Sequence, residues 1–457
     1  MISLKERVLI AELSQHVGKT VTVAGMVTVI RKHGKLMFFE LRDRTASVQT
    51  IVFAQTADAF ATAEHVRPQS PIAIQGTIVE RGEKMRKAGE VNGSIELQIT
   101  AIDILSKVQE LPFELDADLN IETYFDNLPL TLRRERARDI FTLQADIVNT
   151  YRTTLRENGF TEFQAPALVG GDAEGGSAVF KVDYYDDTKA YLATSPQLYK
   201  QIMVGPFERS FTIAKIFRAE KSATTRHLSE ITQMDFEMGF VEDHTNVMAM
   251  LEKVIRSVVA SAEKNHADIF TRFGTTVPLV GEKFPVFTLT EAQEILKKEF
   301  NNDCVGETDL EPEHERQICE YALREHKSDF VFITHYPTAK RAFYTYADPA
   351  RPGFSKSFDL LFRGLEINSG AQRIHDYDEL VARIKERGMD PEKFAFYLQA
   401  FKTGLPPHGG CSTGLERITA RMLELRNVKE ASAFPRDMTR IDLRLHAETA
   451  PAPEEKK

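Results

Sequence analysis

The sequence is poor in cysteine, and it has no long apolar run. Only three of its 457 residues are Cys, and Cys304, Cys319 and Cys411 do not have the spacing of metal ligands. So few cysteines argue against a disulfide-stapled secreted domain and favour a reducing, cytoplasmic compartment. The apolar runs are too short to span a membrane, and the first residues lack the apolar core of a signal peptide. We therefore expect neither a membrane anchor nor a secretory signal.

Positive charge is not in excess either. The formal net charge is -9, which gives no support to nucleic-acid binding driven by overall charge. Basic residues gather in three short stretches, at 31–35, 81–87 and 133–136, and such stretches are more often solvated faces than binding sites. The rest of the composition, with 42% apolar and 27% charged residues, is typical of a globular protein, and the length predicts two or three domains.

The first part of the chain, residues 1–107, has the pattern of an all-β domain. Five short strand-like runs are separated by turns: Val21–Val29, Leu36–Leu41, Val48–Phe53, Ile72–Val79 and Ile95–Ile104. Five strands in this length predict an OB-fold barrel, a fold that commonly binds single-stranded nucleic acid through aromatic and polar side chains. Because neighbouring residues of a strand face opposite sides, one of Phe38 and Phe39 is expected in the core, and the other is free to stack on a base.

The remainder mixes helices and strands, so the fold class expected for the whole chain is α+β. Residues 108–135 are predicted to be a hinge or linker, and residues 136–445 a second domain that begins with a helix from Arg136 to Asn158. Residues 241–330 are predicted to be mostly helical. The last residues, 446–457, have the composition of a disordered tail.

Two stretches of alternating residues flank a polar loop in the second domain. Residues 210–220 and 233–240 predict an antiparallel hairpin whose apolar face includes Met234, Phe236, Met238 and Phe240. The polar face and the loop carry two Arg, one His and three carboxylates: Arg218, Glu220, Arg226, His227, Asp235 and Glu237. Such groups suit a triphosphate together with a charged small substrate. The alternative, a solvated outer face of a sheet, remains open on these residues alone.

A helix is predicted to begin after Ser195 and Pro196, which are typical of a helix start. Gln197 and Lys200 would share a face of its first turn. A Lys close to the amides of a helix N-terminus suits a carboxylate or a phosphate. A plain exposed first turn is the alternative.

A second hairpin is predicted at residues 357–373, turning at Arg363–Gly364. Asp359 and Glu366 flank this turn and are expected to face each other across the strands. Two carboxylates repel each other there unless a cation lies between them, and oxygen ligands beside a polyphosphate suit Mg²⁺. Two unrelated surface acids are the alternative.

Residues 406–417 are rich in glycine and are predicted to form a loop that leads into a helix. The segment has neither the P-loop nor the dinucleotide-binding spacing. His408, beside two prolines, is more readily explained as structural or solvent-exposed than as catalytic.

Segments at three places in the second domain together resemble the class II aminoacyl-tRNA synthetases. Phe217–Glu220, Arg226–Leu228 and Asp235–Met238 are similar to motif 2 of that family. Gly414–Arg417 with Phe434–Asp437 is similar to motif 3, and Glu162–Pro166 to the end of motif 1, which forms the dimer interface in the family. Residues 195–201 and 369–373 are most similar to the aspartyl enzymes of the archaeal and eukaryotic type.

The resemblance implies an ATP-dependent enzyme that joins aspartate to tRNA(Asp), acts as a homodimer, and uses Mg²⁺. It also implies a catalytic domain built on an antiparallel sheet flanked by helices. It assigns the catalytic role to Arg218, between the α-phosphate and the amino-acid carboxylate. ATP would be bound by Arg218, Glu220, Arg226, His227, Leu228, Glu366, Gly414, Leu415, Glu416 and Arg417. Aspartate would be bound by Glu174, Gln197, Lys200, Arg218, Asp235, Ser369 and Arg373. The Mg²⁺ ligands would be Asp359, Glu366 and Ser369, and the anticodon would be read by Phe38, Gln49 and Glu96.

Within this scheme Lys200 and Arg373 hold the β-carboxylate of aspartate, and Asp235 orients Arg373. We expect a neutral asparagine to leave the two cations under-neutralised in a dry pocket. Ile231 stands where many relatives have an aromatic residue on adenine, and an isoleucine covers less of a purine face. Gly25–Met26 stands where relatives often have Gly-Trp or Gly-His, which leaves open whether tRNA(Asn) is a second acceptor.

Two other functions fit parts of the sequence. One is a related ligase that activates aspartate but uses ammonia or a protein as the acceptor, although an anticodon-reading barrel has no purpose there. The other is a nucleic-acid-binding paralogue that has lost catalysis, against which Arg218, Glu366 and Arg417 argue.

Overall fold

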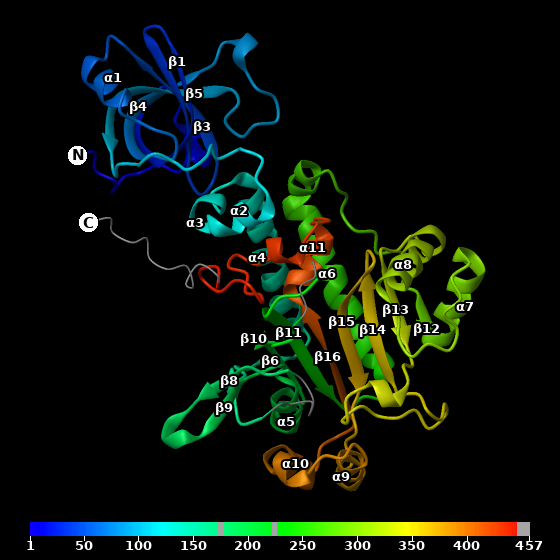
Figure 1. The fold of residues 1–457 in the computed structure, drawn as a ribbon. Coiled ribbons are helices and arrows are strands. Elements are labelled where there is room, and N and C mark those ends of the chain that lie inside the picture. Colours follow the sequence, from blue (N-terminus) through cyan, green and yellow to red (C-terminus); the bar gives the residue numbers. More distant parts are fainter. Residues whose placement is uncertain (172–177, 222–225, 446–457) are drawn as a thin grey trace, which may run out of the picture. The chain divides into compact units, whose positions relative to one another are not determined.

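The chain divides into two compact units, Met1–Ala117 and Asp118–Lys457. The computed structural model describes residues 1–171, 178–221 and 226–445 (Figure 1). The predicted disordered tail therefore lies outside the described residues. No helix among the described residues is long and apolar enough to cross a membrane.

The five strands predicted in the first unit close into a barrel in the order β1-β2-β3-β5-β4. They are β1 (Thr20–His33), β2 (Leu36–Arg42), β3 (Ser47–Phe53), β4 (Pro71–Glu80) and β5 (Ile95–Ile104), with helix α1 (Ala57–Ala63) after β3. Phe39 is fully buried in the barrel core, and its neighbour Phe38 is half-exposed on the other side of the strand. The predicted OB-fold barrel is confirmed.

The second unit is built on a mixed sheet of eight strands in the order β12-β13-β14-β15-β16-β11-β10-β6. These are β6 (Thr161–Glu162), β10 (Arg209–Phe217), β11 (Glu230–Gly239), β12 (Val286–Thr288), β13 (Phe330–Thr334), β14 (Ser357–Phe362), β15 (Leu365–Gln372) and β16 (His408–Gly414). A separate three-stranded sheet consists of β7 (Leu168–Val169), β9 (Lys189–Leu192) and β8 (Lys181–Asp183). The α+β class is confirmed. The sheet is mixed and not purely antiparallel, because β6 pairs with β10 and β12 with β13 in parallel.

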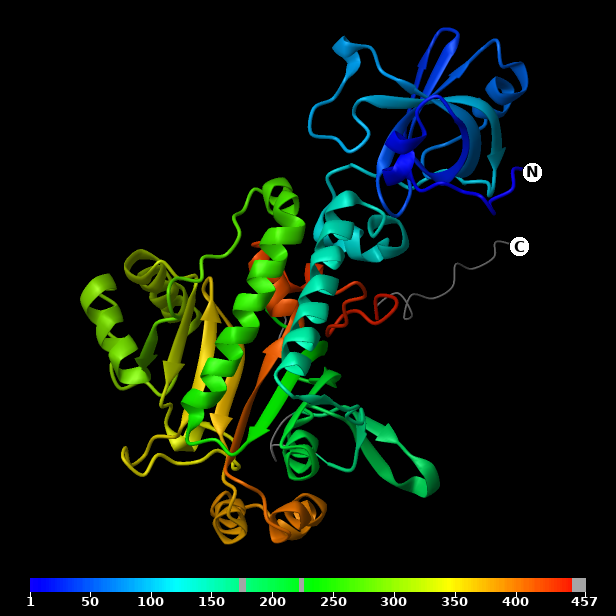
Figure 2. The same ribbon diagram turned by 180° about the vertical axis from the view of Figure 1, so that it is seen from behind.

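Helices cover the large sheet and surround its edges. They are α2 (Ile121–Asp126), α3 (Leu128–Thr131), α4 (Glu135–Glu157), α5 (Gln197–Phe207), α6 (His244–Phe273), α7 (Leu289–Phe300), α8 (Pro312–His326), α9 (Tyr377–Glu386), α10 (Ala395–Lys402) and α11 (Leu415–Met422). Short 3₁₀ turns lie at Ile10–His16, Glu83–Met85, Tyr185–Asp187, Thr338–Lys340, Pro391–Phe394 and Val428–Ala431. The two longest helices, α4 and α6, lie side by side against one face of the sheet (Figure 2), and the main core fills the space between them and the strands.

The predicted motif 2 hairpin is present as β10 and β11, which pair antiparallel from Arg209–Met238 to Phe217–Glu230. Met234, Phe236 and Met238 lie in the core as expected. The fourth residue of that face, Phe240, is 72% exposed and has a positive φ of 56°, because the chain turns out of the strand after Gly239. The expectation for Phe240 was wrong.

The glycine-rich segment at 408–414 is a strand, β16, not a loop. It runs through the middle of the sheet between β15 and β11. Gly410 lies opposite Glu237 of β11, and a Cβ at this position would come within 2.1 Å of a carboxylate oxygen of Glu237. The glycine is thus required by a close approach inside the sheet, and the predicted helix follows it as α11.

Candidate active site

Charged side chains lie buried on the face of the sheet opposite to α4 and α6. Helix α5 brings Lys200 onto the hairpin, and the side chains of Lys200, Asp235 and Glu237 are 0% exposed. The Lys200 Nζ lies 2.8 Å from Asp235 Oδ2, 3.4 Å from Glu237 Oε2 and 3.1 Å from the carbonyl oxygen of Cys411. The polar face of the hairpin is therefore not solvated at Asp235 and Glu237, which argues against a merely solvated outer face.

Arg373, at the end of β15, completes the group. Its Nε donates to Glu237 Oε1 at 2.8 Å, and its Nη2 donates to the carbonyl oxygen of Gly410 at 2.8 Å and to Gln197 Oε1 at 3.4 Å. We call Lys200, Asp235, Glu237 and Arg373 the buried cluster. Burial alone would raise the pKa of Glu237, but the charges of Arg373 and Lys200 outweigh it and hold that pKa below its ordinary value.

The expectation that Asp235 orients Arg373 was wrong, because Glu237 does so. Asp235 instead accepts from Lys200 and from the Ser412 hydroxyl at 2.7 Å. Both acids project from alternate positions of β11, and Glu237 reaches Arg373 over Gly410, where no side chain blocks it. Glu237 was missed as a site residue, although the Asp-x-Glu spacing places it on the same face of the strand as Asp235.

The buried cluster is also charge-balanced, which corrects the expected reason for rejecting asparagine. Two cations face two carboxylates, so a ligand carboxylate is not needed to neutralise them. The two cations can offer a ligand hydrogen-bond donors but no acceptors. Among the described residues, the contacts of Arg373 run from Nε and Nη2, which leaves Nη1 for a ligand. A carboxylate can accept from Arg373 and Lys200, whereas the NH₂ group of an amide would meet donors with a donor.

Polar side chains beneath the cluster fix α5 in place. Gln201 accepts from Gln197 at 2.9 Å and from the Tyr397 hydroxyl at 3.1 Å, and its Nε2 lies 2.9 Å from His408 Nε2. The other ring nitrogen, Nδ1, lies 2.9 Å from the carbonyl oxygen of Pro406. His408 is thus a neutral, buried, structural residue, and burial lowers its pKa to about 4.

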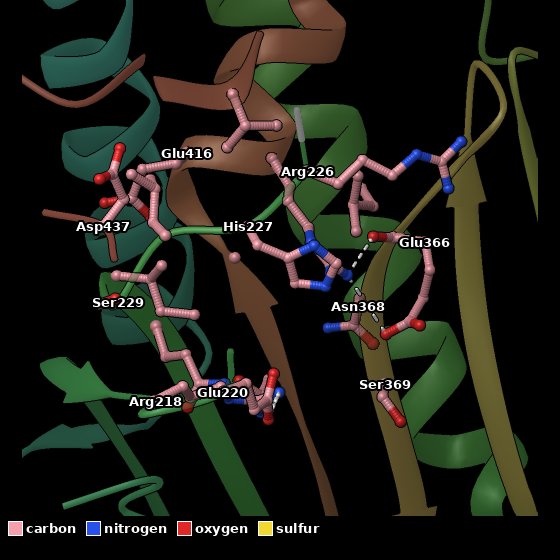
Figure 3. Close-up of a pocket in the computed structure, with 18 residues that line it drawn as sticks. Arg218, Glu220, Arg226, His227, Ser229, Glu366, Asn368, Ser369, Glu416 and Asp437 are labelled. Carbon is pink, nitrogen blue, oxygen red and sulfur yellow. Dashed lines mark hydrogen bonds and ion pairs between the residues drawn. The ribbon is translucent and has the colours of Figure 1, made fainter. Parts of the chain in front are cut away.

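A more open cavity of about 200 Å³ adjoins the cluster (Figure 3). Its walls come from the segment after β10 and from β11, β15, the end of β16 and α11. We call it the open pocket, and it is lined by Arg218, Glu220, Arg226, His227, Leu228, Ser229, Ile231, Gln233, Glu366, Ile367, Asn368, Ser369, Ser412, Gly414, Glu416, Arg417, Val428 and Asp437. The structure thus brings together nearly all of the residues expected to bind ATP. Leu415 is the exception, since it is buried in the core.

Two cations of the open pocket, Arg218 and Arg417, are more exposed than those of the cluster. Arg218 lies 4.0 Å from Glu220, with side-chain exposures of 40% and 45%. Arg417 donates from Nη1 to the carbonyl oxygen of Glu366 at 2.9 Å. Burial, and then the charge of Arg417, lowers the pKa of His227. These groups line an accessible cavity, as phosphate-binding side chains must.

Two lining residues have structural contacts of their own. Glu416 accepts the backbone N–H of Thr232 on both carboxylate oxygens, at 3.1 and 3.0 Å, so it ties α11 to β11. Ile231 lies at the wall of the pocket and packs partly against the core. Both are placed at the pocket, and only Ile231 offers an apolar surface to a base.

The second hairpin differs from its prediction in register. Asp359 lies opposite Ser369 and Glu366 lies opposite Leu361, with an irregularity between Leu360 and Leu361. The two acids are therefore not direct cross-strand partners, although the hairpin turns at Arg363–Gly364 as expected. The two carboxylates still interact electrostatically. Burial, and then the charge of Asp359, raises the pKa of Glu366 to about 7.

A cation is indeed present beside Asp359, and it is Arg341. Its Nη2 lies 2.6 Å from Asp359 Oδ2, and its Nη1 donates to Ser369 Oγ at 3.1 Å. The guanidinium also lies 3.9 Å from the ring centroid of Tyr336. Arg341 was missed because it belongs to none of the motifs in the sequence, and Ser369 is held by it.

The acids nevertheless suit a divalent cation. Asp359 Oδ1 is buried without a hydrogen-bond partner, and the raised pKa of Glu366 is what a nearby dication would reverse. Within the described ranges, no group of three or more His, Cys, Asp or Glu side chains is placed to hold a metal ion. Two carboxylates completed by phosphate oxygens and water are the arrangement that Mg²⁺ often takes.

The remaining predicted residues lie elsewhere. Gln49 and Glu96 meet on neighbouring strands of the barrel, where Gln49 Nε2 donates to Glu96 Oε2 at 3.2 Å. Phe38 packs edge-on against His33, with ring centroids 6.1 Å apart. Glu174 lies outside the described residues.

Comparison with known proteins gives the family. Residues 120–438 match the class II tRNA synthetases for D, K and N, and residues 21–105 match the OB-fold nucleic acid binding domain. The aspartate–tRNA(Asp/Asn) ligase of Thermus thermophilus is 41% identical over 95% of this chain and 99% of its own.

Solved structures of similar fold support the same family. The asparaginyl-tRNA synthetase of Pyrococcus horikoshii with asparaginyl-adenylate is 30% identical, with a TM-score of 0.87 over 96% of this chain and 99% of that one. A putative aspartyl-tRNA synthetase of Leishmania major is 28% identical, with a TM-score of 0.86 over 96% of both chains. With an ATP-using catalytic domain and a tRNA-binding barrel in the expected order, the chain belongs to the class II aminoacyl-tRNA synthetases of the aspartate, lysine and asparagine group.

Proposed function

We propose that this chain is an aspartate–tRNA ligase, which activates aspartate with ATP and transfers it to the 3′ end of tRNA(Asp). The observation that carries the choice of amino acid is the buried cluster. Lys200 and Arg373 offer donors to a short side chain in a dry pocket, and a carboxylate satisfies them where an amide does not. The fold alone does not choose, because an asparaginyl enzyme is among the similar structures.

Positioning and charge supply the chemistry of the first step. The carboxylate of aspartate attacks the α-phosphorus, and diphosphate leaves from the opposite side. Arg218 lies at the end of β10, where the open pocket meets the cluster, and would hold both reacting groups and stabilise the charge that develops at phosphorus. A protein nucleophile is not needed. The Cys411 thiol packs in the core, and burial raises its pKa to about 12.

The other residues of the open pocket divide the nucleotide between them. Glu220 and Ile231 would seat the adenosine, while Arg226, His227 and Arg417 would meet the outer phosphates. Asp359 and Glu366 would hold Mg²⁺, which offsets phosphate charge when it is bound. Gln197 would contact the ammonium group of the amino acid.

The acceptor and the assembly are proposed on separate grounds. The barrel would read the anticodon with Phe38 stacking on a base and with Gln49 and Glu96 hydrogen-bonding. The relative from Thermus thermophilus is named for both tRNA(Asp) and tRNA(Asn), and this chain has Gly25–Met26 in the barrel, so we include tRNA(Asn) as a second acceptor. A homodimer is proposed through α4 and β6, the elements that correspond to motif 1.

Arg218→Ala tests the catalytic assignment. The variant should lose aspartate-dependent pyrophosphate exchange, because only Arg218 joins the two substrates. Lys215→Ala is the matched control, since Lys215 is an exposed cation on the same strand, 3.5 Å from Glu230, and should keep wild-type exchange. Near-normal exchange in Arg218→Ala would refute the proposal.

Charging of transcripts tests the substrates. Labelled aspartate should be attached to tRNA(Asp) and tRNA(Asn) transcripts, whereas labelled asparagine should not be attached to either. Attachment of asparagine would contradict the proposal that the buried cluster selects aspartate. Adenylate formation without charging of any tRNA would instead indicate another acceptor.

A further inference from the structure

Arg226 faces a carboxylate that none of the sequence motifs includes. Glu315 projects from α8, and its Oε2 lies 2.8 Å from Arg226 Nη1, with side-chain exposures of 21% for Arg226 and 12% for Glu315. Arg226 Nη2 also donates to the carbonyl oxygen of Gly364, in the turn between β14 and β15, at 3.4 Å. Figure 3 shows the Arg226 side chain extending past Glu366, away from Arg218 and Glu220.

Both terminal nitrogens of Arg226 thus have protein acceptors. A guanidinium binds a phosphate strongly when two of its nitrogens are directed at it together. Arg226 must therefore give up or share its contact with Glu315 when it binds outer phosphates. The triphosphate attracts Arg226 more strongly than the Glu315 carboxylate does, because it carries more negative charge.

The surroundings of Glu315 make this exchange feasible. Glu315 is largely removed from water, and burial raises its pKa although the charge of Arg226 opposes the rise. The pair is thus weakened by its desolvation, as expected for a buried ion pair with few further hydrogen bonds. Arg417 is the other cation whose charge acts on Glu315, so the carboxylate is not left without any positive neighbour when Arg226 leaves.

We propose that Glu315 is a positioning residue that holds Arg226 against the turn between β14 and β15, and that Arg226 exchanges Glu315 for the outer phosphates when a nucleotide binds. This inference rests on the nucleotide-binding role proposed for the open pocket. Glu315 then competes with ATP for Arg226, and the same contact helps Arg226 to release diphosphate. The apparent dissociation constant of the nucleotide is the intrinsic one divided by the fraction of time that Arg226 is free of Glu315.

Glu315→Gln tests the exchange, because it keeps the shape of the side chain and removes its charge. The Mg²⁺ complex of a non-hydrolysable ATP analogue should bind about 3- to 10-fold more tightly to the variant, and diphosphate should inhibit it at correspondingly lower concentration. The KM for aspartate should not change. Glu313→Gln is the matched control, since Glu313 is an exposed acid in the first turn of the same helix and pairs with Arg316; it should bind the analogue as the wild type does.

The double variant separates exchange from a general effect on the site. Arg226→Ala should bind the analogue more weakly, and adding Glu315→Gln to it should change nothing further. Unchanged or weaker binding by Glu315→Gln alone, or equal gains with and without Arg226, would overturn the proposal. If Glu315→Gln does not fold, Glu315→Asp, which keeps the charge but shortens its reach, should show the same gain in reduced size. Binding is measured without amino acid, so wild-type exchange with aspartate tests the proposed function independently.

Discussion

The buried cluster and the open pocket use the same kinds of charged side chain, but bury them to different degrees. Lys200, Asp235 and Glu237 are 0% exposed and Arg373 is 5% exposed. In the open pocket, Arg218 is 40% and Arg417 is 31% exposed. In the cluster each cation is held by a buried carboxylate within 3 Å, whereas in the open pocket the Glu220 carboxylate lies 4.0 Å from Arg218.

The difference follows from what each region has to recognise. Aspartate and asparagine differ by one small group, so a pocket that separates them has to be dry and fixed before the substrate arrives. ATP is large and highly charged, and exposed cations at an accessible wall are sufficient to bind it. The hairpin of β10 and β11 serves both regions, since Asp235 and Glu237 lie in the cluster and Arg218 lies at the pocket.

Breaking the cluster should have the largest effect on the protein. Lys200→Met leaves Asp235 and Glu237 buried with Arg373 as the remaining cation of the cluster. We expect the free energy of unfolding to fall by about 3–5 kcal/mol, as when one partner of a buried ion pair is removed. Aspartate-dependent exchange should fall by about a thousandfold or more in kcat/KM, because a charge-assisted contact in a dry site is lost. Urea unfolding and pyrophosphate exchange measure the two effects.

Lys215→Met, in strand β10, is the control for Lys200→Met. Lys215 and Glu230 form an ion pair at 3.5 Å with side-chain exposures of 51% and 32%, and exposed pairs of this kind contribute less than about 1 kcal/mol. If the two Lys→Met variants lost similar stability, burial would not be what distinguishes the cluster.

The two regions also differ in how far the sequence predicted them. The hairpins, their turn at Arg363–Gly364 and the barrel strands follow from local alternation and turn residues, and these are present. The residues lining the open pocket lie mostly in contiguous motifs, so they could be named in advance. Pairings inside the cluster could not, because the choice between Asp235 and Glu237 as the partner of Arg373 depends on the register of β16 against β11.

Other differences have similar causes. Arg341 and Glu315 reach the site from segments that no motif marks, and their pairing with Asp359 and Arg226 is tertiary. The glycine run at 408–414 was predicted to be a loop because glycine is common in loops. In the structure, Gly410 instead allows a buried carboxylate to lie against a strand, which composition alone does not reveal.

Low pH should destabilise the protein through His408, the buried histidine beneath the buried cluster. Burial lowers the pKa of His408 from its ordinary 6.5 to about 4, so below pH 6.5 the unfolded chain binds a proton that the folded chain does not. Stability therefore falls as the pH is lowered from 6.5 towards 4, by up to about 1.4 kcal/mol per pH unit for this residue. Between pH 6.5 and 5.0, His408→Asn should lose about 2 kcal/mol less than the wild type in urea unfolding.

His227→Asn places the same change at the open pocket. Burial lowers the pKa of His227 as well, but the residue is only half-buried, so its contribution to the pH dependence should be much smaller. Other titrating groups are shared by all three proteins and cancel in the difference. Equal pH dependence in the wild type and His408→Asn would contradict a buried, neutral His408.

The smallest effect is expected at the apolar wall of the open pocket. Ile231→Phe adds an aromatic ring next to the proposed adenine position, and stacking contributes about 0.5–1.5 kcal/mol beyond buried area. The KM for ATP should fall about 3-fold, while the KM for aspartate stays constant, because the buried cluster is not in contact with the new ring. Inhibition by diphosphate, which has no base, should be unchanged and separates stacking from a rearrangement of Arg226 and Arg417. A weaker affinity for ATP would show that the pocket wall at Ile231 has no room for a larger side chain and is packed as closely as the buried cluster. The buried cluster and the open pocket would then differ in the exposure of their charged groups and not in packing.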